Sequence, residues 1–150
     1  MSDAPIRIRP LEALDRAGWE PLWKGYQTFY EVALPVSSID LTFARLLEPA
    51  EPMHCVVATD GDAIVGIAQF LFHRSTWTPG DYCYLQDLFV LETRRGNGVG
   101  RALIEAVVAR AKAQGASRVY WLTHETNKQA MWLYDQVAEK SGFLQYRFVL

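Results

Sequence analysis

The sequence predicts an α/β domain built around a mixed sheet. Strand-like apolar runs are separated by segments whose apolar residues recur every three or four positions. Half of the 150 residues are hydrophobic and 21% are charged, as in a globular domain with a sizeable core. The predicted order is one strand, two helices, three strands, then helix, strand, helix and strand. This order fits a single α/β domain over residues 1–150.

The first half is expected to form one strand, two helices and a hairpin. Residues 6–11 alternate like a short strand, and residues 15–34 carry aromatic side chains at helical spacing. Residues 38–48 predict a second amphipathic helix. Residues 54–73 predict two strands, and the Asp60-Gly61 dipeptide between them is typical of a tight hairpin turn.

The second half alternates between strands and helices. A long strand over 82–92 is expected to lead through a glycine-rich stretch into a helix over 99–114. A strand over 118–124, a helix over 127–140 and a final apolar strand over 143–150 complete the prediction.

Composition excludes several classes of function. The net charge is −2 and no block of Lys or Arg forms the basic stripe of a general nucleic-acid binder. No apolar run is long enough to span a membrane, and the first residues lack the apolar core of a signal peptide. Cys55 and Cys83 lie inside strand-like runs, which favours buried thiols over a disulfide or a metal site. We therefore expect a cytoplasmic protein without a metal.

The glycine-rich stretch predicts an anion site. Gly96, Gly98 and Gly100 can adopt positive φ and let the backbone approach a ligand closely. The helix that follows begins with unpaired N–H groups and the positive end of its dipole. Three arginines add positive charge beside it: Arg94, Arg95 and Arg101. A tight turn without a ligand is the simpler alternative.

The spacing of the glycines narrows the choice of phosphate. No Lys followed by Ser or Thr comes after Gly100, so the stretch is not a Walker loop. Neither frame of a dinucleotide fingerprint holds, because its third glycine would fall on Arg101 or Leu103. The remaining common anion at such a turn is the pyrophosphate of coenzyme A.

Residues 82–150 resemble the core of the GNAT superfamily of acyl-CoA-dependent N-acetyltransferases, especially its histone/polyamine acetyltransferase-like branch. Three features carry the resemblance together: RRGNGVG after a strand, ETN after the next strand, and MWLY followed by GF. The resemblance implies a mostly antiparallel sheet with splayed central strands and acetyl-CoA as co-substrate. It also implies a homodimer formed through C-terminal elements.

The resemblance also implies which residues hold coenzyme A. Backbone N–H groups of the turn would bind the pyrophosphate, at Arg95, Gly96, Gly98, Val99, Gly100 and Arg101. The preceding strand would pair its backbone with the pantetheine arm, at Leu88, Phe89 and Val90. Asn127 would hold the same arm, its side chain left free because Thr126 and Gln129 form a capping box.

Two side chains are candidates for catalysis. By the resemblance, the hydroxyl of Tyr134 lies near the CoA sulfur and acts as a general acid; a core aromatic is the alternative. Asp87 is the candidate base, directly or through water, because a carboxylate inside an apolar strand is costly unless paired or wet. It could instead be structural, and His124 and Glu125 are further candidates. Polyamine enzymes of this superfamily tend to carry Glu-Asp here, whereas this chain has Gln86 before Asp87.

Four residues are candidates for binding the acceptor. Aromatic rings with one carboxylate can surround an amine, and the predicted cage consists of Tyr26, Tyr30, Glu31 and Trp77. The expected function is acetyl transfer from acetyl-CoA to a primary amine of a small molecule, such as an amino acid or polyamine. Acetylation of a lysine in a protein tail and acyl-CoA binding without turnover are the alternatives.

Overall fold

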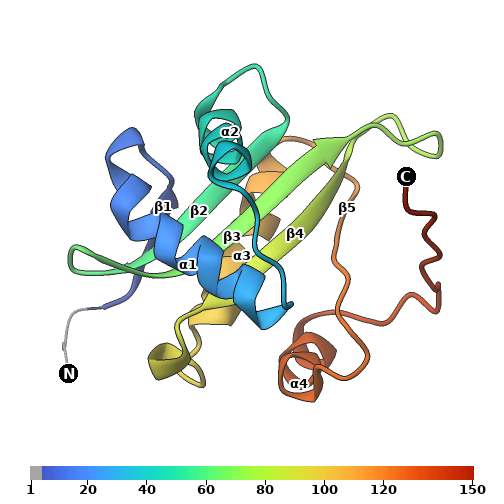
Figure 1. Ribbon diagram of the computed structural model, residues 1–150. Coiled ribbons are helices and arrows are strands. Elements are labelled where there is room, and N and C mark those ends of the chain that lie inside the picture. The colour runs from blue at the N-terminus through green and yellow to red at the C-terminus, as the bar shows by residue number, and fades with distance from the viewer. Residues whose placement is uncertain (1–4) are drawn as a thin grey trace.

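The computed structural model describes residues 5–150, whose strands form one five-stranded sheet in the order β1-β2-β3-β4-β5. The first four strands pair antiparallel and β4 pairs parallel with β5, so the sheet is mixed and mostly antiparallel, as predicted. Figure 1 shows the strands side by side in chain order. Their bounds are β1 Arg7–Pro10, β2 Met53–Asp60, β3 Ala63–His73, β4 Tyr82–Val90 and β5 Arg118–Tyr120.

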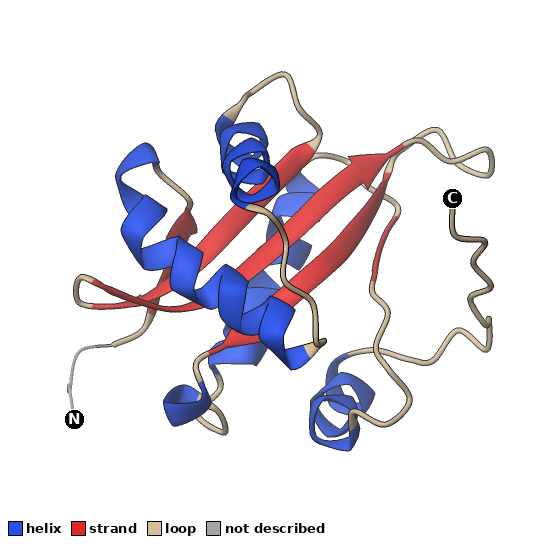
Figure 2. Cartoon of the chain, in the orientation of Figure 1, coloured by secondary structure: helices blue, strands red, loops and turns tan. Residues whose placement is uncertain are grey.

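Helices cover both faces of the sheet. Two helices lie on one face and α3 lies on the other, with α4 beyond β5 (Figures 1 and 2). The α-helices are α1 Arg16–Phe29, α2 Val36–Leu47, α3 Val99–Ala113 and α4 Lys128–Val137; two short 3-10 helices are η1 Ala13–Asp15 and η2 Glu92–Arg94. None of the described helices is both long and apolar enough to cross a bilayer.

Alternation along the strands divides the core in two. In β2, Val56 and Ala58 pack toward α3, whereas Cys55 and Val57 pack toward α1 and α2. Successive side chains of a strand point to opposite faces, so one apolar run fills both layers. Both faces of β4 therefore pack against core residues, and this packing fixes the position of the side chains that β4 carries.

Several predicted boundaries shift. The hairpin strands end at Asp60 and resume at Ala63, so the turn residues are Gly61 and Asp62, and Gly61 takes the positive φ of 58°. The first helix ends at Phe29 rather than residue 34. Thr126 and Gln129 form no capping box, because the Thr126 hydroxyl lies 2.7 Å from His124 Nδ1.

The prediction of a final strand is wrong. Residues 138–150 contain no regular secondary structure and are exposed throughout. Figure 1 shows this segment running clear of the sheet. A strand requires a neighbour to satisfy its backbone hydrogen bonds, and no strand of the described chain pairs with this segment. High β propensity alone therefore does not produce a strand here.

The two strands β4 and β5 separate soon after they meet. They pair only over Tyr82–Tyr84 and Arg118–Tyr120, and the chain leaves strand conformation at Trp121. The prediction of a strand reaching residue 124 is therefore wrong, because the β4 partner is lost at the split. Beyond Tyr84, no strand of residues 5–150 lies beside the edge of β4 that faces β5, which confirms the predicted splayed centre.

Candidate active site

A cleft of about 510 Å³ opens where β4 and β5 separate. One wall is the free edge of β4, including Leu88, Phe89 and Val90, and the opposite wall begins at Trp121. An exposed strand edge offers N–H and C=O groups to an extended ligand, as another strand would. The three β4 residues predicted to bind the pantetheine arm thus lie along the cleft.

The glycine turn forms one end of the cleft. Gly96 and Gly98 have φ values of 81° and 83°, in the left-handed region that favours glycine. A Cβ built at either position would meet no atom within 4 Å, so the space beside the turn is open. Gly98 is the N-cap of α3, whose first N–H groups have no partner within the helix. The turn therefore fits a pyrophosphate group.

The arginines of the turn divide into different roles. Arg94 forms an ion pair with Asp60 that ties η2 to the β2–β3 hairpin. The side chain of Arg95 donates from Nε to the carbonyl of Val90 at 3.0 Å, and its backbone N–H donates to the carbonyl of Glu92. That N–H is thus not free for the predicted phosphate contact, although the Arg95 side chain lines the cleft.

The remaining predicted cofactor residues also border the cleft. Val99, Gly100 and Arg101 do so from the first turn of α3, and Asn127 from the start of α4. Asn127 is the N-cap of α4, and its side chain makes no capping hydrogen bond. Its side chain is therefore not engaged in capping, although the capping box expected to leave it free is absent.

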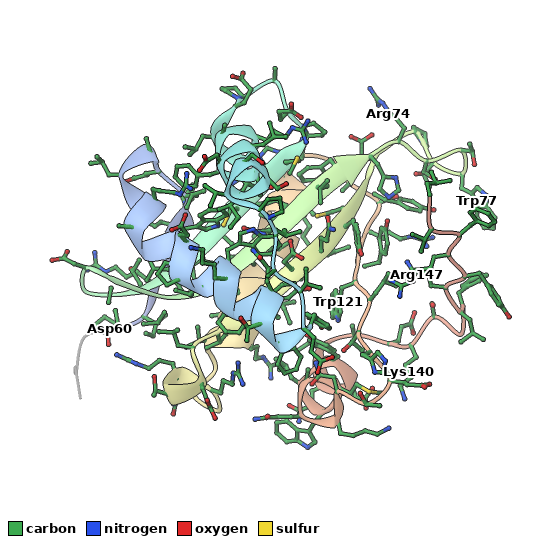
Figure 3. All side chains as sticks on the ribbon, viewed as in Figure 1. Asp60, Arg74, Trp77, Trp121, Lys140 and Arg147 are labelled. Carbon is green, nitrogen blue, oxygen red and sulfur yellow. The ribbon has the colours of Figure 1, made fainter. Side chains whose placement is uncertain are left out.

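Tyr134 lies in the wall formed by α4. Its ring packs edge-on against Trp121 with 5.5 Å between centroids, and it lines the cleft. Figure 3 shows Trp121 near α4, where the chain leaves β5. Burial, followed by the neighbouring Tyr30, raises the pKa of Tyr134 to about 12. The hydroxyl is protonated at neutral pH and can donate a proton or a hydrogen bond.

Asp87 does not line the main cleft. It borders a second cavity of about 120 Å³, on the side of the sheet covered by α1 and α2, and Gln86 lines both spaces. The register of β3 and β4 shifts between Gln69 and Phe70, which places Gln86 as an extra residue in β4. This bulge lies beside Asp87, at the point where the two spaces meet.

The environment of Asp87 suits a base. Burial raises its pKa to about 6, although hydrogen bonds from Gln69 and Tyr26 act in the opposite direction. A carboxylate with this pKa is ionised at neutral pH and holds a proton more readily than an ordinary Asp. The other candidate bases, His124 and Glu125, are exposed and line neither cavity.

The predicted acceptor cage is only half assembled. Tyr26 and Tyr30 line the cleft with 4.9 Å between ring centroids. Glu31 is exposed and lies outside both cavities. Trp77 is 83% exposed in the loop between β3 and β4, on the far side of β5 from Trp121 in the view of Figure 3. The structure does not bring these four side chains together.

Sequence reasoning missed two polar contacts at the site. Gln69 donates from Nε2 to Asp87 Oδ2 at 2.8 Å, and Trp19 donates from Nε1 to Gln69 Oε1 at 2.8 Å. The available signal was a glutamine inside the apolar run IVGIAQFLFH, since a buried amide needs partners. Its partners lie 18 and 50 residues away in sequence, so only the fold identifies them.

Comparison with known proteins agrees with this geometry. A model of the Acetyltransferase (GNAT) family matches residues 19–138. The D-amino-acid N-acetyltransferase of Saccharomyces cerevisiae is 39% identical over 145 residues, covering 95% of this chain and 89% of the yeast protein. The thialysine N-epsilon-acetyltransferase of Mus musculus is 33% identical over 108 residues, which cover 63% of each chain.

Solved structures show the same fold. The aminoglycoside N-acetyltransferase AAC(6′)-Iy, bound to a bisubstrate analogue containing CoA, gives a TM-score of 0.85 at 17% identity over 98% of this chain and 99% of that one. The ribosomal-protein-alanine N-acetyltransferase of Brucella melitensis gives 0.79 at 20% identity over 97% and 100%. With its splayed sheet and its glycine turn at the start of α3, the chain belongs to the acetyltransferase (GNAT) family, whose members use acetyl-CoA.

Proposed function

We propose that the protein transfers the acetyl group of acetyl-CoA to the primary amine of a small molecule by direct attack in a ternary complex. The main observation in support of this proposal is one cleft that has an open glycine turn at one end, a free strand edge along its length and the Tyr134 phenol in its wall. The similar yeast protein is named for D-amino acids, so amino acids are the first acceptor class to test, followed by polyamines.

The reaction sets three tasks for the chain. The amine attacks the activated carbonyl of the thioester, so it must first lose a proton and become neutral. The oxyanion that forms on the carbonyl oxygen needs a hydrogen-bond donor, and the leaving thiolate needs an acid. Backbone N–H groups of β4 near Leu88 face the split and suit the oxyanion. The protonated hydroxyl of Tyr134 suits the thiolate. Asp87 suits the amine proton.

Asp87 takes this proton through water. It lies outside the cleft lining, but its small cavity adjoins the cleft at Gln86 and is large enough to hold water. The same cavity is bordered by Trp23, whose buried indole N–H has no hydrogen-bond partner among the described residues. A water in this cavity would have Trp23 as donor and Asp87 as acceptor.

The acceptor approaches from the end of α1. Tyr26 and Tyr30 present two rings to the cleft, and the Tyr26 hydroxyl donates to the carbonyl of Gln86 at 3.4 Å. These rings offer faces to a cation and lie beside the point where the two cavities meet. They select the acceptor, whereas Glu31 and Trp77 have no contact with the cleft.

The protein acts as a homodimer in the cytoplasm. Residues 138–150 expose a set of large apolar side chains: Phe143, Leu144, Tyr146, Phe148, Val149 and Leu150. An apolar patch of this kind is typical of an interface, and the second copy is the partner expected from the family branch. The cytoplasmic location rests on two free buried cysteines, Cys55 and Cys83.

A panel of amines tests this function. The protein is incubated with acetyl-CoA and D- and L-amino acids, a polyamine or a lysine-containing peptide, and released thiol and product mass are measured. We expect thiol release and one added acetyl group with a small primary amine. Turnover with the peptide alone would favour a protein substrate, and tight CoA binding without any turnover would favour a regulatory module.

A further inference from the structure

Two buried hydrogen bonds connect Asp87 to Gln69 and Gln69 to Trp19, so that three residues from three elements form one polar network. Asp87 in β4 lies directly across the sheet from Gln69 in β3, and Gln69 lies beneath Trp19 of α1. The amide of Gln69 is buried, and Trp19 has no exposed surface. The two hydrogen bonds of this network are both 2.8 Å long. No part of it belongs to the cleft that holds acetyl-CoA.

The chemistry of Trp19 determines which way the amide faces. An indole nitrogen is only a donor, so the group that it meets must be an acceptor. The carbonyl oxygen of Gln69 must therefore face Trp19, which leaves its NH₂ group facing the carboxylate. A reversed amide would bring two donors together at Trp19 and two acceptors together at Asp87. The orientation of Gln69 is thus imposed from α1.

Among residues 5–150, no cation stabilises the ionised Asp87. Within this range, three other titratable groups face Asp87, and all are neutral near pH 7: Tyr26 from α1, Cys55 from β2 and Tyr84 from β4 itself. The part of the chain that the structure describes contains no Lys, Arg or His in an ion pair with Asp87. The hydrogen bond from Gln69, at 2.8 Å, is thus the main interaction that favours the charged carboxylate, with a lesser contribution from the nearby Tyr26 hydroxyl.

We propose that Gln69, oriented by Trp19, is a positioning residue that fixes the Asp87 carboxylate and keeps it in its proton-accepting form. A neutral donor suits this role, because it stabilises the carboxylate only moderately. An adjacent cation would lower the pKa of Asp87 strongly and so weaken Asp87 as a base. The inference rests on the proposed role of Asp87 as the base in acetyl transfer.

The test compares the titration of Asp87 in matched variants. Gln69→Met keeps an unbranched side chain of similar size and removes the donor. We expect the pKa of Asp87, followed by carboxyl carbon NMR, to rise by about one unit or more, a tenfold change in proton affinity. The acidic limb of the pH profile of kcat/KM should move upward by the same amount, because Asp87 must be ionised to accept a proton.

Two tryptophans, one on α1 and one in an exposed loop, provide a matched pair. Trp19→Phe removes the N–H that orients the amide, so we expect a smaller upward shift of the same titration. Trp77→Phe makes the same chemical change in the exposed loop between β3 and β4, outside both cavities, and should leave the titration in place. Trp19→Phe also serves as the test if Gln69→Met does not fold.

The outcomes separate this inference from the proposed function. An unchanged Asp87 titration in folded Gln69→Met and Trp19→Phe overturns the role of Gln69, even if Asp87→Asn is inactive. A shifted titration, together with a kcat/KM of Asp87→Asn lowered by roughly 10²-fold or more, supports it. A shifted titration together with a fully active Asp87→Asn would overturn the link to catalysis, because Gln69 would then tune a carboxylate that the reaction does not use.

Discussion

Replacing Asp87 by asparagine should make the protein more stable and less active at the same time. The folded-state pKa of Asp87 is raised from 3.8 to about 6 by burial. The native state thus holds this proton more tightly than the unfolded chain does. Ionisation of Asp87 therefore costs stability, and the cost is absent below the unfolded pKa and complete above the folded pKa.

The size of the effect follows from the shift. A rise of about two units, at roughly 1.4 kcal/mol per unit, makes the ionised carboxylate cost about 3 kcal/mol of unfolding free energy. The asparagine side chain would keep an oxygen to accept from Gln69 and carry no charge. We expect the variant to exceed the wild type in unfolding free energy by up to that amount at about pH 8, and by little at about pH 4.

Urea unfolding at the two pH values measures the difference in unfolding free energy between variant and wild type. Asp15→Asn is the control, for which the expected change in stability has the opposite sign. Arg9 donates to both carboxylate oxygens of Asp15 and lowers its pKa, so its charge stabilises the fold above the unfolded pKa. That variant should lose stability at high pH and approach the wild type as the pH falls.

Activity completes the prediction for Asp87. If Asp87 accepts the amine proton, Asp87→Asn should lower kcat/KM by roughly 10²-fold or more and remove the acidic limb near pH 6. Less stability at about pH 8 with normal activity would refute the reasoning, since it would describe a carboxylate that serves only the fold.

Other predictions concern the cleft and the exposed tail. Tyr134→Phe removes only the hydroxyl, so kcat should fall by roughly 10- to 100-fold with CoA affinity within a few-fold; a normal kcat where chemistry limits the rate would end its role as acid. Gly98→Val should weaken CoA binding at least tenfold, about 1.4 kcal/mol by calorimetry. Gly115→Val, which strains a similar φ of 77° at the other end of α3, should keep CoA affinity. Light scattering should show a dimer at micromolar concentration and a monomer without residues 141–150; a monomeric full chain would contradict the proposed interface.

The sheet and the cofactor turn were predictable because their signals are local. Apolar spacing located the helices, and alternate glycines before α3 located the turn with its positive φ values. The splayed strands followed from the resemblance that those motifs carry. In each case the residues that produce the feature are neighbours in the chain.

The failures depend on distant partners. Residues 143–150 have strand propensity, but no strand in the described part of the chain pairs with them, and residues 121–124 lose β4 at the split. The contact between Gln69 and Asp87 depends on the register of β3 against β4 and on the extra residue at Gln86. Trp77 was placed near the amine by residue type alone, and the loop directs it elsewhere.

Single-turnover mass spectrometry tests direct acetyl transfer most directly. Excess protein is mixed with acetyl-CoA and the best amine of the panel, and the masses of protein, amine and CoA are followed together. Direct attack predicts that the acetyl group passes from CoA to the amine at equal rates of loss and gain, with the protein unmodified throughout. An acetylated protein that forms and decays at the turnover rate, or thiol release without an acetylated amine, would contradict it.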